Sequence, residues 1–122
     1  MLRFDCPISE TARIAKKELA LNGCPIHRGD TVTASLSAAN HDPQKFSDPH
    51  RFDIHRDNSE HLAFGSGIHV CLGAPLARLE AQIAIRNLLA RFPKISLALN
   101  AQPVKRILPF FSGFTELRVR LQ

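Results

Sequence analysis

The stretch from Thr11 to Ala34 opens with a loose mixture of strand-forming and charged residues up to Leu21, and it closes with Thr31 to Ala34, which has the pattern of a strand. Asn22-Gly23 stands within this stretch, and that dipeptide is a strong signal for a two-residue turn between antiparallel strands. The stretch therefore predicts small β-hairpins. Directly after it, Leu36 to Asn40 predicts a single helical turn.

Residues 41–62 carry several prolines and aspartates and show no sustained helical or strand period. Such a stretch predicts an irregular loop that is nevertheless packed. Three apolar side chains are expected to anchor it: Phe46, Phe52 and Leu62.

The longest helix is predicted over Pro75 to Phe92. Pro75 suits a first helical turn because a proline lacks only an N–H that would be unpaired there, and Pro93 ends the run. Apolar residues recur at helical spacing and are expected to form one broad stripe buried in the core. The stripe comprises Leu76, Ala77, Leu79, Ile83, Ala84, Leu88, Leu89 and Phe92.

Two alternating stretches follow the helix and predict strands over Lys94 to Leu99 and over Thr115 to Leu121. Ser112-Gly113 marks a turn ahead of the second stretch. The phenylalanines near this turn are expected to pack in the core, with the lining of a pocket as the alternative: Phe110, Phe111 and Phe114. Together these elements predict an α+β fold with one long helix and a terminal β-hairpin.

Length and composition favour one modest domain over residues 1–122. The chain is 44% hydrophobic, which excludes a disordered composition. No apolar run approaches the length of a membrane helix and no signal-peptide core follows Met1, so a cytoplasmic protein with no membrane partner is expected. Cys6, Cys24 and Cys71 form no CxxC pair, which indicates reduced thiols rather than a disulfide framework.

The net charge of +5 is concentrated in the C-terminal part of the chain. Residues 1–77 carry eight Lys or Arg against nine Asp or Glu, whereas residues 78–122 carry eight against two. Such an excess either forms a solvated basic face or docks an acidic protein. Nucleic acid is not an expected partner, because every aromatic residue is Phe and the basic residues form no runs.

Cys71 is the candidate functional residue, because it lies in a glycine-rich loop just ahead of the long helix. A helix N-terminus stabilises a thiolate over a thiol, and a thiolate is a good nucleophile or metal ligand. Gly65 and Gly67 permit a tight turn and a close approach to a flat partner, and Gly73 removes a side chain beside the sulfur. The alternative is that Cys71 is a small buried hydrophobe.

Five of the six histidines invite a zinc hypothesis, because they are spread through residues 41–69. None of them is paired at the i, i+4 spacing of a helical site, and no second cysteine lies nearby. Zinc is therefore not expected at this set: His41, His50, His55, His61 and His69.

The loop and the start of the helix resemble the haem-binding signature of the cytochrome P-450 haem-thiolate monooxygenases, particularly the soluble bacterial ones. Every fixed position of that signature is filled: Phe64-Gly65-x-Gly67-x-His69-x-Cys71-x-Gly73-x-x-Leu76-Ala77-Arg78. The resemblance implies iron protoporphyrin IX held by the Cys71 thiolate, with Phe64 packed near the sulfur and Gly65 and Gly73 shaping the loop. In the family, thiolate ligation pushes electron density onto the iron and favours O–O cleavage.

The same resemblance places His69 on one haem propionate and Arg13 on another. An arginine suits that role because its guanidinium donates two parallel hydrogen bonds to a carboxylate. Taken as a bare strand residue, Arg13 would instead be a surface charge.

The resemblance extends over essentially all 122 residues and covers only the C-terminal portion of a family member. It implies that Arg3 is the arginine of the family's Glu-x-x-Arg helix, whose glutamate would lie before residue 1, and that Arg51 in the meander loop completes a salt-bridge network with that pair. Without the resemblance, Arg3 would be an exposed terminal charge. The resemblance also places an acidic electron donor such as ferredoxin on the long helix, with Arg78 and Arg86 as candidate contacts and plain surface charge as the alternative.

The expected protein is therefore a truncated, haem-ligating C-terminal portion of a cytochrome P-450-like monooxygenase. Nothing between Met1 and Gln122 resembles the family's distal helix, its acid and alcohol pair or most of its substrate loops, so oxygen-dependent monooxygenation by this chain alone is not expected. Two alternatives stay open. One is a haem-free remnant or interaction module that docks an acidic redox partner through its basic helix, and the other is a separate chain that supplies the N-terminal portion.

Overall fold

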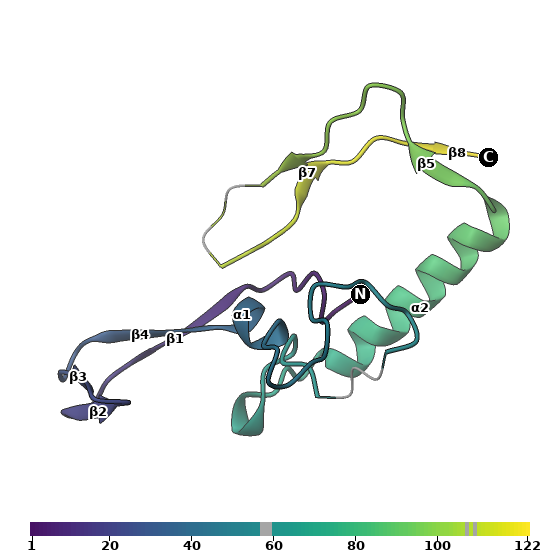
Figure 1. The fold of residues 1–122 in the computed structure, drawn as a ribbon. Coiled ribbons are helices and arrows are strands. Elements are labelled where there is room, and N and C mark those ends of the chain that lie inside the picture. The colour runs from purple at the N-terminus through teal and green to yellow at the C-terminus, as the bar shows by residue number, and fades with distance from the viewer. Residues whose placement is uncertain (57–59, 107, 109) are drawn as a thin grey trace. The chain divides into compact units, whose positions relative to one another are not determined.

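The computed structural model of the protein describes residues 1–56, 60–106, 108 and 110–122. The chain divides into two compact units: the first comprises Met1–Ala63 and Leu108–Phe111, and the second comprises Phe64–Ile107 and Ser112–Gln122. Each unit combines helix with strand (Figure 1), which confirms the predicted mixture of the two.

Two antiparallel strand pairs lie in the first unit. Strand β1 (Glu10–Ile14) pairs with β4 (Thr31–Ser35), and β2 (Leu19–Leu21) pairs with β3 (Cys24–Ile26). Asn22-Gly23 joins β2 to β3 with φ values of 48° and 81°, the left-handed conformation that a tight hairpin turn requires. The predicted hairpins are confirmed, and the turn lies at the predicted dipeptide.

Helix α1 (Leu36–Asn40) follows β4 directly and confirms the predicted helical turn. Ser35 caps it, because its hydroxyl accepts the N–H of Ala38 at 3.1 Å. The carbonyl of Ser9 accepts the N–H of Leu36 at 2.8 Å, so the start of the helix is tied to the segment that leads into β1.

Arg3 is buried, with 3% of its surface exposed, so its interpretation as an exposed terminal charge is wrong. Its guanidinium donates to the carbonyl of Asn40 at 2.6 Å and to that of Pro49 at 2.9 Å. Its central carbon lies 5.0 Å from the ring centre of Phe46. Burial lowers the pKa of the Arg3 guanidinium, and the charge of Arg56 lowers it further.

Residues 41–66 contain no helix or strand among the described positions. This agrees with the irregular loop that was predicted over residues 41–62. Phe46 is buried, which confirms it as an anchor of this loop, and the N–H of half-buried Leu62 donates to the side-chain oxygen of Asn40 at 2.7 Å. Phe52 does not bury itself: 53% of its surface is exposed, and its ring meets that of Phe4 edge-on with 5.3 Å between the centroids.

The second unit is built on helix α2 (Ala74–Arg91), within one residue of the predicted helix at each end. Pro75 lies in its first turn, and Phe92 caps its C-terminus by donating its N–H to the carbonyl of Leu88 at 2.8 Å. A short 3-10 helix, η1 (Gly67–His69), precedes it.

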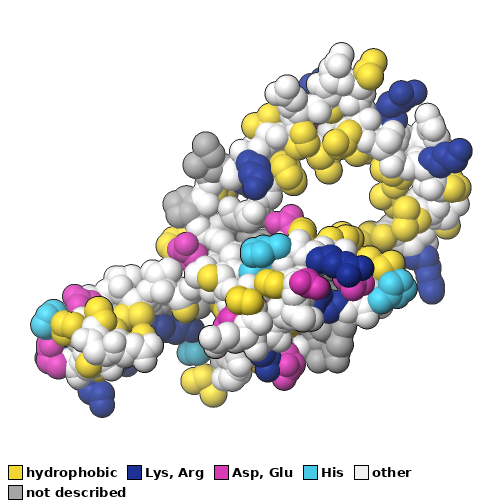
Figure 2. Space-filling view, in the orientation of Figure 1, with side chains coloured by type: hydrophobic (Ala, Val, Ile, Leu, Met, Phe, Trp, Pro, Cys, Tyr) yellow, Lys and Arg dark blue, Asp and Glu magenta, His cyan; other side chains and the backbone are white. Residues whose placement is uncertain are grey.

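The apolar residues of α2 do not form the buried core stripe that the sequence predicted. At 3.6 residues per turn, Leu76, Leu79 and Ile83 lie on one side of the helix, whereas Ile85 and Leu88 lie on roughly the opposite side. None of the eighteen residues is buried, and the exposed fractions of these five run from 39% to 59%. Figure 2 shows hydrophobic side chains open along the helix. A helix that is apolar on two sides needs cover on both, and within the described part of the chain neither side of α2 is buried.

Two short antiparallel ribbons complete the second unit. Strand β5 (Ile95–Leu97) pairs with β8 (Val119–Leu121), and β6 (Val104–Lys105) pairs with β7 (Phe114–Glu116). The single strand predicted over Thr115 to Leu121 is therefore two strands with a break after β7. The terminal ribbon itself is confirmed.

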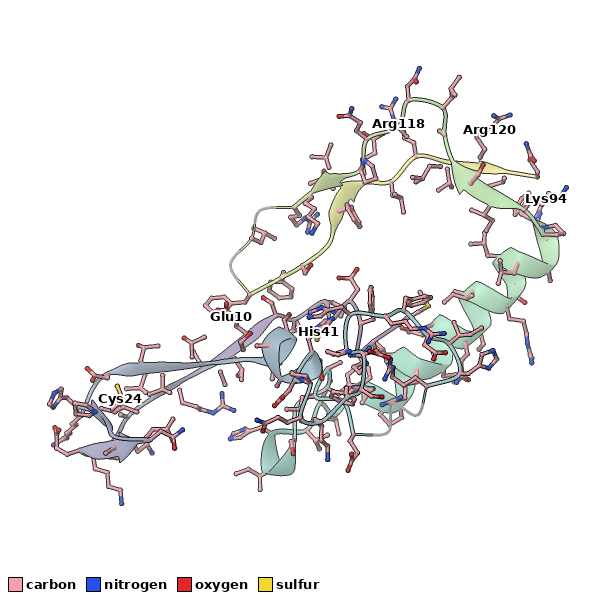
Figure 3. All side chains as sticks on the ribbon, in the orientation of Figure 1. Glu10, Cys24, His41, Lys94, Arg118 and Arg120 are labelled. Carbon is pink, nitrogen blue, oxygen red and sulfur yellow. The ribbon has the colours of Figure 1, made fainter. Side chains whose placement is uncertain are left out.

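Basic side chains extend from the β5–β8 ribbon (Figure 3). Arg120 pairs in register with Ser96, and the carbonyl of Arg118, just before β8, accepts the N–H of Ala98 at 3.0 Å. The Nε of Arg118 donates to the carboxylate of Glu116, which neutralises one of these charges.

The phenylalanines near Ser112-Gly113 are not core residues. Phe110 and Phe111 belong to the first unit, where the carbonyl of Phe110 accepts the N–H of Ser9 at 2.9 Å, and Phe114 opens β7 in the second. Between 43% and 55% of each side chain is exposed, so the expectation of core packing is wrong.

Among the described residues, no helix is both long and apolar enough to span a bilayer.

Candidate functional site

A closed loop presents Cys71 at the start of α2. The N–H of Cys71 donates to the carbonyl of Phe64 at 2.8 Å, which joins the two ends of the loop. Inside it, the N–H of Val70 donates to the carbonyl of Gly67 at 3.1 Å and closes the single turn of η1. The carbonyl of Cys71 then accepts the N–H of Ala74 at 3.2 Å, so the loop runs straight into the helix.

The loop needs glycine at Gly65 for two separate reasons. Its φ is +72°, and a Cβ added there would lie 3.2 Å from the carbonyl oxygen of His69. Gly67 also has a left-handed φ, +63°, but a Cβ there would meet nothing within 4 Å. At Gly73 an added Cβ would lie 3.8 Å from the Cys71 sulfur, in ordinary contact, so this glycine leaves the flank of the sulfur open. These positions confirm the tight turn inferred from the glycine pattern.

Gly65 and Gly67 offer a matched pair of substitutions for the loop. We expect Gly67→Ala to destabilise the closed loop by about 1 kcal/mol, the cost of holding an alanine in the left-handed conformation. Gly65→Ala should destabilise it by about 1–2 kcal/mol more, because the added methyl also crowds the backbone of the loop. Amide hydrogen exchange of Cys71, whose N–H closes the loop, measures both. Equal acceleration in the two variants would show that the contact with His69 has no effect.

Cys71 is exposed, and it is a free thiol. The alternative that Cys71 is a buried hydrophobe is therefore wrong, and the buried cysteine is Cys6, with 3% of its surface exposed. Two apolar side chains of the same segment are open to solvent: Ile68 exposes 96% of its surface and Leu72, next to Cys71 in the chain, exposes 98%. An exposed sulfur donor in a segment with open apolar side chains suits a largely apolar ligand with a thiolate-binding metal, so these residues fit a haem.

Phe64 is held at its side chain as well as at its backbone. The guanidinium carbon of Arg78, in the second turn of α2, lies 5.1 Å from the centre of the Phe64 ring. Arg78 has a fixed position in the signature that also contains Phe64, but it was predicted only to have a docking or surface role, and this contact was missed. The signal that could have found it is the shared signature, although only the return of the loop onto the helix brings the two side chains together.

The structure brings five of the six predicted cofactor-binding residues into one loop: Phe64, Gly65, His69, Cys71 and Gly73. The sixth, Arg13, lies on β1 in the first unit, opposite Val32 in the register. It is exposed, and its guanidinium donates to the Thr11 hydroxyl at 3.0 Å and to the Ala12 carbonyl at 2.8 Å. Its contact with a propionate stays a prediction.

A family model described as Cytochrome P450 matches residues 1–114. Among curated proteins, 6-deoxyerythronolide B hydroxylase of Saccharopolyspora erythraea is 46% identical over 99% of this chain and 30% of its own length. Cytochrome P450 monooxygenase PikC of Streptomyces venezuelae is 48% identical over 98% of this chain and 29% of its own length. The chain thus spans less than a third of the length of either curated relative.

Solved structures agree with these sequence matches. P450BioI in complex with an acyl carrier protein ligated to hexadec-9Z-enoic acid matches with a TM-score of 0.91 and 45% identity, over 99% of this chain and 31% of its own. CYP109E1 from Bacillus megaterium in complex with testosterone matches with a TM-score of 0.93 and 37% identity, over 98% of this chain and 33% of its own. The similarity in sequence and in fold therefore covers the same stretch.

Proposed function

Because this chain belongs to the cytochrome P450 family, we propose that Cys71 is the axial thiolate ligand of a haem iron. The observation that carries the proposal is an exposed, free cysteine in a closed glycine loop at a helix start. A haem-free interaction module is not favoured, because the matching family model and the relatives above are those of haem proteins.

Other residues of the chain have supporting roles in this proposal. The Phe64 ring and the flanking glycines keep the sulfur accessible, while His69 and Arg13 each donate to a haem propionate. When bound, the haem would supply the electron transfer and oxygen chemistry of the family, which the thiolate promotes by donating electron density to the iron. The three thiols are free, which suits a reducing cytoplasmic setting.

Partners and reaction belong to the same proposal. We infer oxygen-dependent monooxygenation for the complete fold, in which the two apolar sides of α2 are covered by further protein of the same or of a second chain. The basic excess of residues 78–122 favours an acidic electron donor such as ferredoxin, with Arg78 and Arg86 among its contacts. Docking of this kind weakens as ionic strength rises.

A haemin titration of the purified chain tests the proposal. We expect uptake of haem and, after reduction under carbon monoxide, the shifted Soret band that thiolate ligation gives. Haem uptake without that band would exclude Cys71 as the ligand. Absence of uptake would leave the chain without its proposed cofactor and overturn the assignment.

A further inference from the structure

Phe64 forms one end of the loop that holds Cys71, and both its backbone and its ring help to hold it in place. Its backbone carbonyl accepts the Cys71 N–H at 2.8 Å. Its ring lies under the guanidinium of Arg78, with 5.1 Å between the guanidinium carbon and the ring centre. Because Arg78 belongs to α2, the same helix that continues from Cys71 also reaches back to the other end of the loop.

An arginine suits this contact better than a lysine does. A guanidinium is planar and weakly hydrated, so it stacks on an aromatic face while its edge stays in water, whereas an ammonium is a compact and strongly hydrated point charge. Phe64 is half-buried and Arg78 is exposed, so the guanidinium can cover the ring from the solvent side. The contact therefore depends on the shape of the side chain as well as on its charge.

We propose that Arg78 is a positioning residue for the Cys71 sulfur: by stacking on Phe64 it keeps the loop closed before any ligand arrives. The inference rests on the proposed role of Cys71 as a thiolate ligand. A ligand held in place beforehand loses less conformational freedom on binding, so the stacked pair favours haem capture by keeping the loop in its closed form. Arg78 then acts within the loop, in addition to any part it has in docking.

Amide hydrogen exchange of Cys71 in the haem-free chain measures loop closure directly. We expect about threefold faster exchange in Arg78→Gln and in Arg78→Lys, the range expected for loss of an exposed cation–π contact. Arg86→Gln removes an equal charge further along the same helix and should leave the rate unchanged. The Phe92 amide, which caps the far end of α2, should keep its wild-type rate in all three variants.

A double-mutant cycle isolates the pair. Phe64→Leu keeps an apolar side chain but removes the aromatic face, so combining it with Arg78→Gln should accelerate exchange no more than either change alone. In the haemin-loaded protein, Arg78→Gln and Arg78→Lys should lower the fraction of haem that shows the thiolate-type Soret band, while Arg86→Gln retains it.

Three results would overturn the inference: wild-type exchange in Arg78→Lys, equal acceleration in Arg78→Gln and Arg86→Gln, or an unprotected Cys71 amide in the wild-type chain. The first two would show that charge alone matters, and the third that the loop is not closed in advance. A chain that gives the thiolate-type band but shows no response to Arg78 would keep its proposed function and lose this inference.

Discussion

Replacing Cys71 with serine is expected to abolish the thiolate-type Soret band of the haemin-loaded protein. A serine hydroxyl stays protonated at neutral pH and offers the iron no sulfur donor, so any haem that binds must show a different ligand. The replacement is nearly isosteric, and the closing hydrogen bond of the loop uses the backbone N–H of residue 71, which serine also has. The loss should therefore report ligation and not collapse of the loop.

The chain contains its own controls. Cys24 is exposed on β3, so Cys24→Ser removes an accessible thiol from a different element and should keep the band. Cys6 is buried and donates to the carbonyl of Ile8 at 2.9 Å, and burial raises the pKa of its thiol, so it supplies little thiolate at neutral pH. If the band survives in Cys71→Ser and disappears in Cys24→Ser, the ligand is Cys24, and our assignment of Cys71 is wrong.

Replacing Arg3 with methionine is expected to lower the free energy of unfolding of the first unit by about 3 kcal/mol. Methionine preserves most of the apolar stem that packs in the interior. It leaves the carbonyls of Asn40 and Pro49 without the donors that now lie at 2.6 Å and 2.9 Å, and it removes the cation from the face of Phe46. An acceptor without a donor is costly at the buried Asn40 and less so at the half-buried Pro49, and together these costs exceed the gain from removing a buried charge.

Arg51→Met is the matched control, because Arg51 belongs to the loop that contains Pro49, one of the acceptors of Arg3, and its own side chain is exposed. Its cost should stay within about 0.5 kcal/mol, as for an ordinary surface position. Urea unfolding followed by far-ultraviolet circular dichroism measures both variants, since the chain has no Trp or Tyr to report by fluorescence. Coincident unfolding curves for the two variants would mean that burial of Arg3 contributes nothing to stability.

Most elements of this fold follow from neighbouring residues and could be predicted from them. Asn22-Gly23 fixes the hairpin turn because only residues tolerant of left-handed φ satisfy it. Helix α2 has Pro75 in its first turn and ends before Pro93, where a proline cannot continue a helix. The prediction of one continuous strand over Thr115 to Leu121 was wrong. Residue alternation indicates a strand but not the break that arises because β7 pairs with β6 while β8 pairs with β5.

The candidate site was predictable to the extent that it is local. Five of its residues lie within ten positions and share one loop, so the residues themselves indicated an accessible thiolate, and the family resemblance of their spacing indicated haem. The propionate contacts of His69 and Arg13 come from the resemblance as well, and they stay predictions. The stacking of Arg78 on Phe64 was not predicted, because the signature fixes the two positions in the sequence but does not show that their side chains meet.

The sequence by itself determined the turns, the helix limits and the glycine loop around Cys71, because backbone conformation there depends on residues only a few positions away. Only the tertiary structure decided which side chains are buried. Arg3 is enclosed by carbonyls 37 and 46 positions further along the chain, whereas the apolar residues of α2 stay exposed. Burial depends on what lies across space from a residue, and hydrophobicity along the chain states only what a side chain requires, not whether the fold supplies it.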